Sequence, residues 1–170
     1  SSDLAFTNMD SVTKEVKLML DPSAVPPADN GAPQRFGAKD VRDLTWKQLM
    51  DAYTCTECGR CTSSCPANLT GKKLSPRKVM MDTRDRLEEV GRGIDKHGPD
   101  YQDGKSLADR ITEEELWACT SCNACTEACP VNIDPLSIIV DMRRYLVMEE
   151  SKVPQELAGM FNKEIGRAHV

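Results

Sequence analysis

Along two stretches of the chain, side chains suited to a protein core recur at the spacing of one helical face. The first stripe is Val79, Met80, Thr83, Leu87 and Val90, and the second is Ile138, Ile139, Met142, Tyr145 and Leu146. Positions three and four apart lie on one side of a helix, so each stripe predicts a helix with one buried face. Gly91 follows the first stripe and predicts the end of that helix. Strand-like alternation bounded by turns is not seen, and the pattern favours an all-α fold.

Two kinds of helix start each occur twice. Capping boxes, in which a Thr is followed three residues later by Gln or Glu, are found at Thr45/Gln48 and Thr112/Glu115. An N-cap residue followed by proline at the first helical position is found at Ser75–Pro76 and Asp134–Pro135. The sequence therefore predicts helices that open after residues 45, 75, 112 and 134.

All eight cysteines fall in two copies of one pattern. They are Cys55, Cys58, Cys61 and Cys65, followed by Pro66, and Cys119, Cys122, Cys125 and Cys129, followed by Pro130. The spacing C-x2-C-x2-C-x3-C-P is that of bacterial-type ferredoxins, in which three closely spaced thiolates hold one face of a 4Fe-4S cubane. Two such runs predict two 4Fe-4S clusters as cofactors.

The fourth cysteine of each run is expected to serve the other cluster, as in two-cluster ferredoxins. On this hypothesis one cluster is held by Cys55, Cys58, Cys61 and Cys129, and the second by Cys119, Cys122, Cys125 and Cys65. The proline that follows each fourth cysteine has a fixed φ and no amide proton. It therefore keeps a helix from continuing through the site.

Three other interpretations of the cysteines are weaker. Disulfides need an oxidising compartment, and neither a secretory signal nor scaffold-like spacing is visible. A zinc site needs paired C-x2-C knuckles, and the third cysteine and the C-P of each run exceed what tetrahedral zinc requires. Coincidental buried cysteines do not explain a register that is repeated.

The repeat extends beyond the ligands. At an offset of 64 residues, Tyr53 matches Trp117 and Thr56 matches Thr120, and Asp82 and Arg84 match Asp141 and Arg143 after a short gap. Such similarity indicates a duplicated supersecondary unit, so we expect two helical halves related by a pseudo-twofold axis. A full helix separates the two runs, which excludes the compact β-hairpin ferredoxin and favours an α-helical ferredoxin.

The stretch from about residue 37 to 148 resembles the α-helical ferredoxin domain found in the C subunits of heterodisulfide reductase and of anaerobic glycerol-3-phosphate dehydrogenase. Residues 54–61, TCTECGRC, and 116–122, LWACTSC, are similar to those of large membrane-associated iron-sulfur oxidoreductases. Those proteins carry this domain between a cytochrome b-like membrane part and cysteine-rich CCG domains. The resemblance implies an electron-transfer module whose partners are a flavoprotein, a CCG domain or a cytochrome b-like membrane part.

Composition and charge narrow the function further. A net charge of −5 argues against nucleic acid as a partner. Hydrophobic residues make up 39% of the chain, and no run of about 18 apolar residues is present, so no membrane span is expected. We expect a cytoplasmic location, at the inner face of the cell membrane if a partner or a missing segment provides an anchor.

Several side chains outside the cysteine runs have two interpretations. The basic concentration Lys72, Lys73, Arg77 and Lys78 is either a solvated loop and helix start or a surface that docks an acidic redox partner and offsets cluster charge. Arg84, Arg143 and Arg144 are further candidates for such compensation. His97 is expected at the surface of a polar loop rather than as a ligand. The methionines are expected to fill the core, namely Met19, Met50, Met80, Met81, Met142 and Met148.

We divide the chain into four parts. Residues 1–36 are an N-terminal segment and linker, 37–150 the dicluster domain, and 151–163 the start of a linker to a missing C-terminal region. Residues 164–170, which include His169, match a translated sequencing adapter and are expected to be an artefact.

The sequence contains no recognisable dinucleotide loop, P-loop, zinc-protease motif or paired catalytic carboxylates, so an enzymatic role stays uncertain. Electron relay needs none of these. The alternatives are a part of a catalytic CCG-domain subunit like those of heterodisulfide reductases, and a structural or oxygen-sensing iron-sulfur protein.

Overall fold

The computed structural model describes Leu20 and residues 36–167. The elements are η3 (Val41–Asp43), α2 (Trp46–Thr54), α3 (Arg60–Ser63), α4 (Pro66–Leu69), α5 (Pro76–His97), η4 (Leu107–Asp109), α6 (Glu113–Ala118), α7 (Ala124–Glu127), α8 (Pro135–Met148) and α9 (Gln155–Arg167). Every regular element in this part of the chain is a helix, which confirms the all-α prediction. Met19, His169 and most of the predicted N-terminal segment and linker, residues 1–19 and 21–35, lie outside the described residues.

The four predicted helix starts are confirmed. Both capping boxes form, since Gln48 N and Glu115 N donate to the Thr45 and Thr112 hydroxyls while the two side chains accept from the N-cap amides. The helices with an N-terminal proline begin behind caps of the expected kind, with Ser75 accepting from Lys78 N and Asp134 accepting from the first turn of α8. Local sequence therefore determines where these helices begin.

The predicted end of α5 at Gly91 is wrong, because the helix continues to His97. Gly98 ends it instead, with φ 93° and an amide that donates to the carbonyl of Ile94 over 2.8 Å. The polar loop predicted to begin at Gly91 therefore begins only after the helix. Tertiary packing explains the extra turns. Gly93 is buried, and the ring of Tyr101 lies so close that a Cβ at Gly93 would sit 2.0 Å from it.

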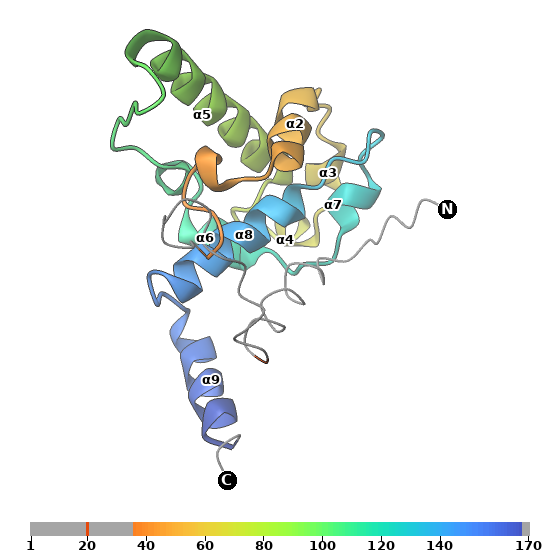
Figure 1. The fold of residues 1–170 in the computed structure, drawn as a ribbon. Helices are drawn as coiled ribbons and strands as arrows, with labels where there is room; N and C mark the ends of the chain where they lie inside the picture. Colours follow the sequence, from red (N-terminus) through yellow and green to blue (C-terminus); the bar gives the residue numbers. More distant parts are fainter. Residues whose placement is uncertain (1–19, 21–35, 168–170) are drawn as a thin grey trace.

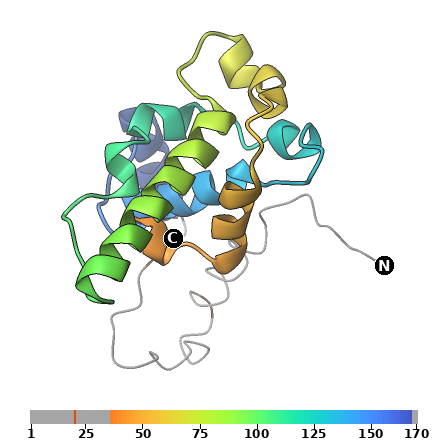
Figure 2. The same cartoon turned by 90° about the horizontal axis from the view of Figure 1, so that it is seen from above.

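The chain order repeats itself around the core, with α2, α3 and α5 in the first half and α6, α7 and α8 in the second. α2 packs on α5 and α6 on α8 within the halves, while α3 packs on α7 and α5 on α8 between them. Figure 2 shows α5 passing across α8, on which it packs. This arrangement fits two halves related by a pseudo-twofold axis.

Two polar links cross between the halves at equivalent places. The Nε2 of Gln48 on α2 donates to Asp141 on α8 over 2.7 Å. In the other half, Glu115 on α6 reaches Asp82 on α5 through Lys78, whose Nζ lies 2.9 Å from Glu115 and 3.0 Å from Asp82. The capping residue of each short helix therefore also fastens it to the long helix of the other half.

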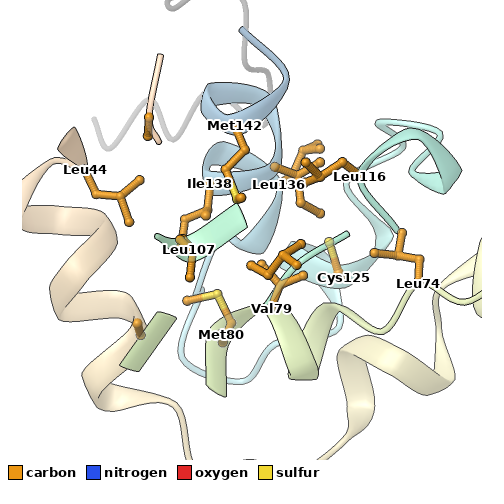
Figure 3. Close-up of a cluster of buried hydrophobic side chains, with 14 of the residues drawn as sticks. Leu44, Leu74, Val79, Met80, Leu107, Leu116, Cys125, Leu136, Ile138 and Met142 are labelled. Carbon is orange, nitrogen blue, oxygen red and sulfur yellow. The ribbon is translucent and has the colours of Figure 1, made fainter. Parts of the chain in front are cut away.

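The core lies between α5 and α8. Figure 3 shows Val79 and Met80 from α5 facing Leu136, Ile138 and Met142 from α8. Both predicted stripes are therefore confirmed as buried faces. Two cysteines, Cys65 and Cys125, belong to the same buried set, so the apolar core continues up to the cysteine runs.

Arg86 is a buried cation that the hydrophobic stripes did not indicate. Its side chain is 3% exposed and binds Asp40 before η3 and Asp103 in the loop after α5, at 2.8 and 2.5 Å. The guanidinium also donates to the carbonyl of Lys105. The pairing holds the pKa of Asp103 well below its usual range, because Arg86 donates hydrogen bonds to the carboxylate. Arg86 thereby links two segments to the middle of α5: the residues just before η3, through Asp40, and the loop at 98–106, through Asp103.

Residues 151–163, predicted as the start of a linker, contain most of α9, which extends away from the other helices in Figure 1. Where the domain ends and a linker begins stays a prediction. Across the described part of the chain, no helix combines the length and the apolar character that crossing a bilayer requires.

We expect Arg86→Met to lower the free energy of unfolding by about 3 kcal/mol, because it leaves two partly buried carboxylates without their cation. The matched control is Arg92→Met on the same helix. Arg92 is 68% exposed and pairs with Glu88 at the surface, so its loss should change stability by less than about 0.5 kcal/mol. Urea unfolding of oxygen-protected protein, followed by circular dichroism, measures both. Equal effects would show that the Arg86 ties contribute no more than a surface ion pair.

Two glycines of α5 give a second matched pair. A Cβ at Gly91 meets nothing within 4 Å, whereas a Cβ at Gly93 meets the Tyr101 ring. Gly91→Ala should therefore raise the free energy of unfolding by up to about 1 kcal/mol through helix propensity. Gly93→Ala should lower it by about 1 to 3 kcal/mol through overpacking. Stabilisation by both substitutions would contradict the packing described for the loop at 98–106.

Candidate iron-sulfur site

The first cysteine run is shaped by left-handed residues. Cys55 caps the C-terminus of α2, and the chain then passes through Glu57 at φ 59° and Gly59 at φ 82° before α3 begins. Cys61 lies in α3, and Cys65 is the N-cap of α4. A non-glycine residue at positive φ is uncommon, so Glu57 is held there by its surroundings. The two reversals turn the loop so that three cysteines can face one space.

The second run repeats this conformation. Cys119 caps the C-terminus of α6, Ser121 has φ 55° and Asn123 has φ 60°, and Cys125 lies in α7. Asn123 stands where the first run has Gly59. Asparagine is one of the few residues other than glycine that visits this conformation readily, because its short amide bonds locally. The backbone geometry of the two runs is therefore the same despite different residues.

One cavity brings cysteines of both runs together. It is lined by Cys55, Cys58 and Cys61 of the first run and by Cys129 and Cys125 of the second. Met80, Ile133 and Pro135 supply apolar walls. The structure thus places Cys129 at the same cavity as the first triad, although the two are far apart in sequence.

Cys65, Cys119 and Cys122 are the cysteines that do not line this cavity. Burial is the main cause that raises the pKa of Cys119, and the charges of nearby Cys65 and Cys122 raise it further. Cys65 of the first run therefore lies near Cys119 of the second run. Cys125 lies close enough to Cys119 for the same kind of interaction.

A cubane and a single metal ion need different arrangements of their ligands. Among the described residues, no three side chains of His, Cys, Asp or Glu come together as the ligands of a single metal ion would. Tetrahedral zinc requires such convergence on one point. A cubane takes one thiolate at each of four separated irons, which suits cysteines spread around a cavity.

Backbone amides are aimed at several of the sulfurs. Ser121 N donates to Cys119 Sγ over 3.5 Å, and Ile133 N donates to Cys129 Sγ over 3.4 Å. The amide of Ala124 and the hydroxyl of Thr120 lower the pKa of Cys122. Hydrogen bonds of this kind stabilise the anionic sulfur that binds iron.

Burial acts in the opposite direction on the deeper cysteines. It raises the pKa of Cys61, and it raises the pKa of Cys125 to about 12. Both cysteines are thiols at neutral pH unless a metal replaces the proton. Iron binding therefore releases protons and removes the cost of burying a charged sulfur alone.

The structure also shows where the basic cluster and His97, named from the sequence, lie. Lys73 and Lys78 reach across to Glu114 and Glu115 of α6, so they link the halves and are not simply solvated. Lys72 and Arg77 are exposed, and Arg77 also lines the cysteine cavity. His97 is exposed and stacks on Tyr101, which confirms a surface position.

The assignment of all methionines to the core is partly wrong. Met80 and Met142 are buried, but Met50 is 56% exposed and Met148 is 42% exposed. Met50 lies on the outer face of α2 because Gln48 and Ala52 occupy the buried face. Helical spacing alone did not distinguish the two faces of this helix.

The apolar walls of the cavity were not predicted from the sequence. Ile133 follows Cys129 by four residues and Pro135 opens α8, and neither was assigned to the site. The alignment of Gly59 with Asn123 could have predicted the left-handed turn in each run, because both residue types adopt positive φ readily. The roles of Arg84 and Arg143 required coordinates, since their partners include backbone carbonyls.

Comparisons with known proteins agree with this geometry. Residues 54–133 match the family described as the 4Fe-4S dicluster domain. The chain is 37% identical over 153 residues to a probable iron-sulfur-binding oxidoreductase, FadF, of Bacillus subtilis, a match that covers 72% of this chain and 22% of that protein. It is 37% identical over 136 residues to a probable membrane-anchored ferredoxin of Chromohalobacter salexigens, covering 70% and 20%.

A third relative is the C subunit of the ferredoxin/F420H2-dependent CoB-CoM heterodisulfide reductase of Methanosarcina acetivorans. The chain is 31% identical to it over 119 residues, covering 69% of this chain and 60% of that relative. The chain spans only about a fifth of the length of the first two relatives.

The eight cysteines and the family match give the domain two 4Fe-4S clusters as its cofactors. Residues 54–133 therefore form a domain of the 4Fe-4S dicluster family, and the chain is similar to the C subunit of a heterodisulfide reductase and to iron-sulfur oxidoreductases.

Proposed function

We propose that this chain is an electron-transfer module that relays electrons through two 4Fe-4S clusters inside a larger oxidoreductase. When bound, each cluster takes up and gives back one electron at a time. The observation that best supports the proposal is the shared cavity. Cysteines of both runs line it at the boundary between the two halves, which we call the seam. Cofactors held at one seam are near neighbours, as relay requires.

The exposure of the cysteines is consistent with two places at which electrons enter and leave the domain. The second cysteine of each run, Cys58 or Cys122, is exposed, whereas Cys65 and Cys125 are buried. Each run therefore has one cysteine at the surface and one in the core. Because the runs are related by the pseudo-twofold arrangement, the two exposed cysteines offer separate faces for a donor and an acceptor.

We assign the ligands crosswise. Cys55, Cys58, Cys61 and Cys129 hold cluster 1, and Cys119, Cys122, Cys125 and Cys65 hold cluster 2. The support is that Cys129 lines the cavity of the first triad, and that Cys65 lies near Cys119 and adds to the rise that burial causes in its pKa. In this assignment each half supplies one cysteine ligand to the cluster of the other half.

The partners follow from the family. We propose a flavoprotein, a CCG domain or a cytochrome b-like membrane part as donor or acceptor, in a cytoplasmic complex at the inner face of the membrane. The name of one relative, a probable membrane-anchored ferredoxin, supports such an attachment. A second candidate is that the chain belongs to a catalytic subunit. Its short coverage of the first relatives favours that candidate, and the complete reading frame decides it.

The relay is tested on oxygen-protected, reconstituted protein. Two clusters of four irons predict roughly eight irons and eight sulfides per chain, and reduction should give paramagnetic cluster signals in electron paramagnetic resonance (EPR) spectra. Colourless, iron-free protein would contradict cluster binding. Clusters that bind but give no signal at accessible potentials would contradict relay and favour a structural role.

Crossed ligation is tested by comparing variants of the fourth cysteines with variants of the exposed second ones. Cys129→Ser should change the same EPR signal as Cys58→Ser, and Cys65→Ser the same signal as Cys122→Ser, because each pair shares a cluster. The opposite pairing, Cys129 with Cys122 and Cys65 with Cys58, would show that each run closes its own cube. Cys129→Ser and Cys65→Ser should also lower the unfolding temperature, since each removes a link between the halves.

A further inference from the structure

Two arginines occupy equivalent places beside the two cysteine runs. Arg84 on α5 and Arg143 on α8 each lie nine residues after the N-cap of their helix, Ser75 or Asp134. Each guanidinium donates to the carbonyl oxygen of the first cysteine of a run, Arg84 to Cys55 over 3.5 Å and Arg143 to Cys119 over 2.5 Å. The two halves therefore use the same residue to hold the start of each ligand loop.

The same arginines also reach the left-handed residue of each loop. Arg84 forms an ion pair with Glu57, and Nη1 of Arg143 lies 3.4 Å from the hydroxyl of Ser121. Glu57 and Ser121 are equivalent positions with nearly the same backbone, at φ 59° and 55°. One site thus carries a carboxylate where its counterpart carries a neutral hydroxyl.

This difference leaves unequal charge at the two sites. Arg84 is balanced by Glu57, and Asp85 lies 3.7 Å away. Arg143 donates to the carbonyls of Leu116 and Cys119 and lies over the Trp117 ring at 5.0 Å. In the described part of the chain, none of these partners of Arg143 is a carboxylate. Arginine stays protonated, and among the described side chains of residues 36–167 no carboxylate forms an ion pair with Arg143 to offset its charge beside the second run.

We propose that residues 57 and 121, acting through Arg84 and Arg143, separate the reduction potentials of the two clusters. Reduction adds one electron from an external reductant and breaks no bond, so it makes the cluster more negative. A nearby fixed cation stabilises that added charge, and a paired cation does so less. Arg143 therefore favours the reduced state of the cluster at Cys119, whereas the Glu57–Arg84 pair gives the cluster at Cys55 little such help.

The proposal deepens the relay and rests on it, since it assigns a direction to the transfer. The difference between these two arginines favours movement of an electron from the cluster beside Arg84 toward the cluster beside Arg143. Arg77, which lines the cavity at Cys55, acts in the opposite direction, so the test compares changes caused by residues 57, 84, 121 and 143 alone. Arg84 and Arg143 are positioning residues in this account, because they bind carbonyls of the ligand loops and do not themselves ligate iron.

The experiment exchanges the two loop residues and measures the midpoint potential of each cluster by redox titration followed by EPR. Ser121→Glu should lower one midpoint by about a tenfold change in the one-electron equilibrium, which is about 59 mV. Glu57→Ser should raise the other midpoint by a similar amount. Glutamate is compatible with the backbone at position 121, because Glu57 already adopts that conformation.

Further variants separate charge from structure. Arg143→Met should lower the same midpoint as Ser121→Glu, while Arg143→Lys, which keeps the charge, should restore most of the potential. Arg92→Met, an exposed change on α5, should move neither midpoint. If Ser121→Glu binds no iron, Glu57→Ser and Arg143→Met give the same test.

If the one-electron reduction equilibrium of each cluster changes by less than about threefold in all of these variants, with both clusters bound and reducible, the proposal is overturned. The relay is then still supported. A shift of both midpoints together would also overturn the proposal, since the charge would then act on the whole domain. Absence of any reducible cluster in the unmodified chain would instead contradict the relay itself.

Discussion

Cysteines from two distant runs face one cavity at the seam of the molecule, and the rest of the structure depends on this arrangement. The helices that carry the ligands are very short, with α3 and α7 at four residues each. Helices of this length are not stable alone, because nucleation costs more than one turn returns. In the proposed crossed ligation, iron–thiolate bonds across the seam would supply the missing stability, since binding free energy is folding free energy when no site exists in the unfolded chain.

The apolar core and the cofactor site form one continuous structure. Cys65 and Cys125 are buried with the aliphatic side chains, and Met80 belongs both to the core and to the wall of the cysteine cavity. An apolar shell limits the access of water to the clusters and affects their potentials. Through Met80, the stripe on α5 therefore serves both the packing of the core and the cysteine cavity.

Much of the site was predictable because its signals are local. The cysteine spacing, the capping boxes at Thr45 and Thr112 and the two N-caps followed by proline are each contained in a few residues, and the helix starts they predict are confirmed. Gly91 was misinterpreted because the end of α5 depends on Tyr101, which packs on Gly93 from a later loop. Lys78 and Arg86 were not recognised as ties because their acidic partners come from distant segments. Composition and periodicity contain no information about such pairings.

The duplication gives two equivalent sites, and the differences between them give the molecule a direction. The left-handed turns, the carbonyl-binding arginines and the cross-links from Gln48 and Glu115 are repeated in both halves. The pairing of Arg84 with Glu57 is not repeated at Arg143. A symmetric frame keeps the clusters close, and unequal charges at equivalent positions are a simple way to make one of them the better acceptor.

The central claim is that each half supplies one ligand to the cluster of the other. A crystal structure of the oxygen-protected protein, with iron located by its anomalous scattering, tests this most directly. The account predicts two compact groups of iron, with Cys129 bound to the group that holds Cys55, Cys58 and Cys61, and Cys65 bound to the group that holds Cys119, Cys122 and Cys125. Iron groups in which each run binds only its own four cysteines, or which lie far apart on separate faces, would contradict it.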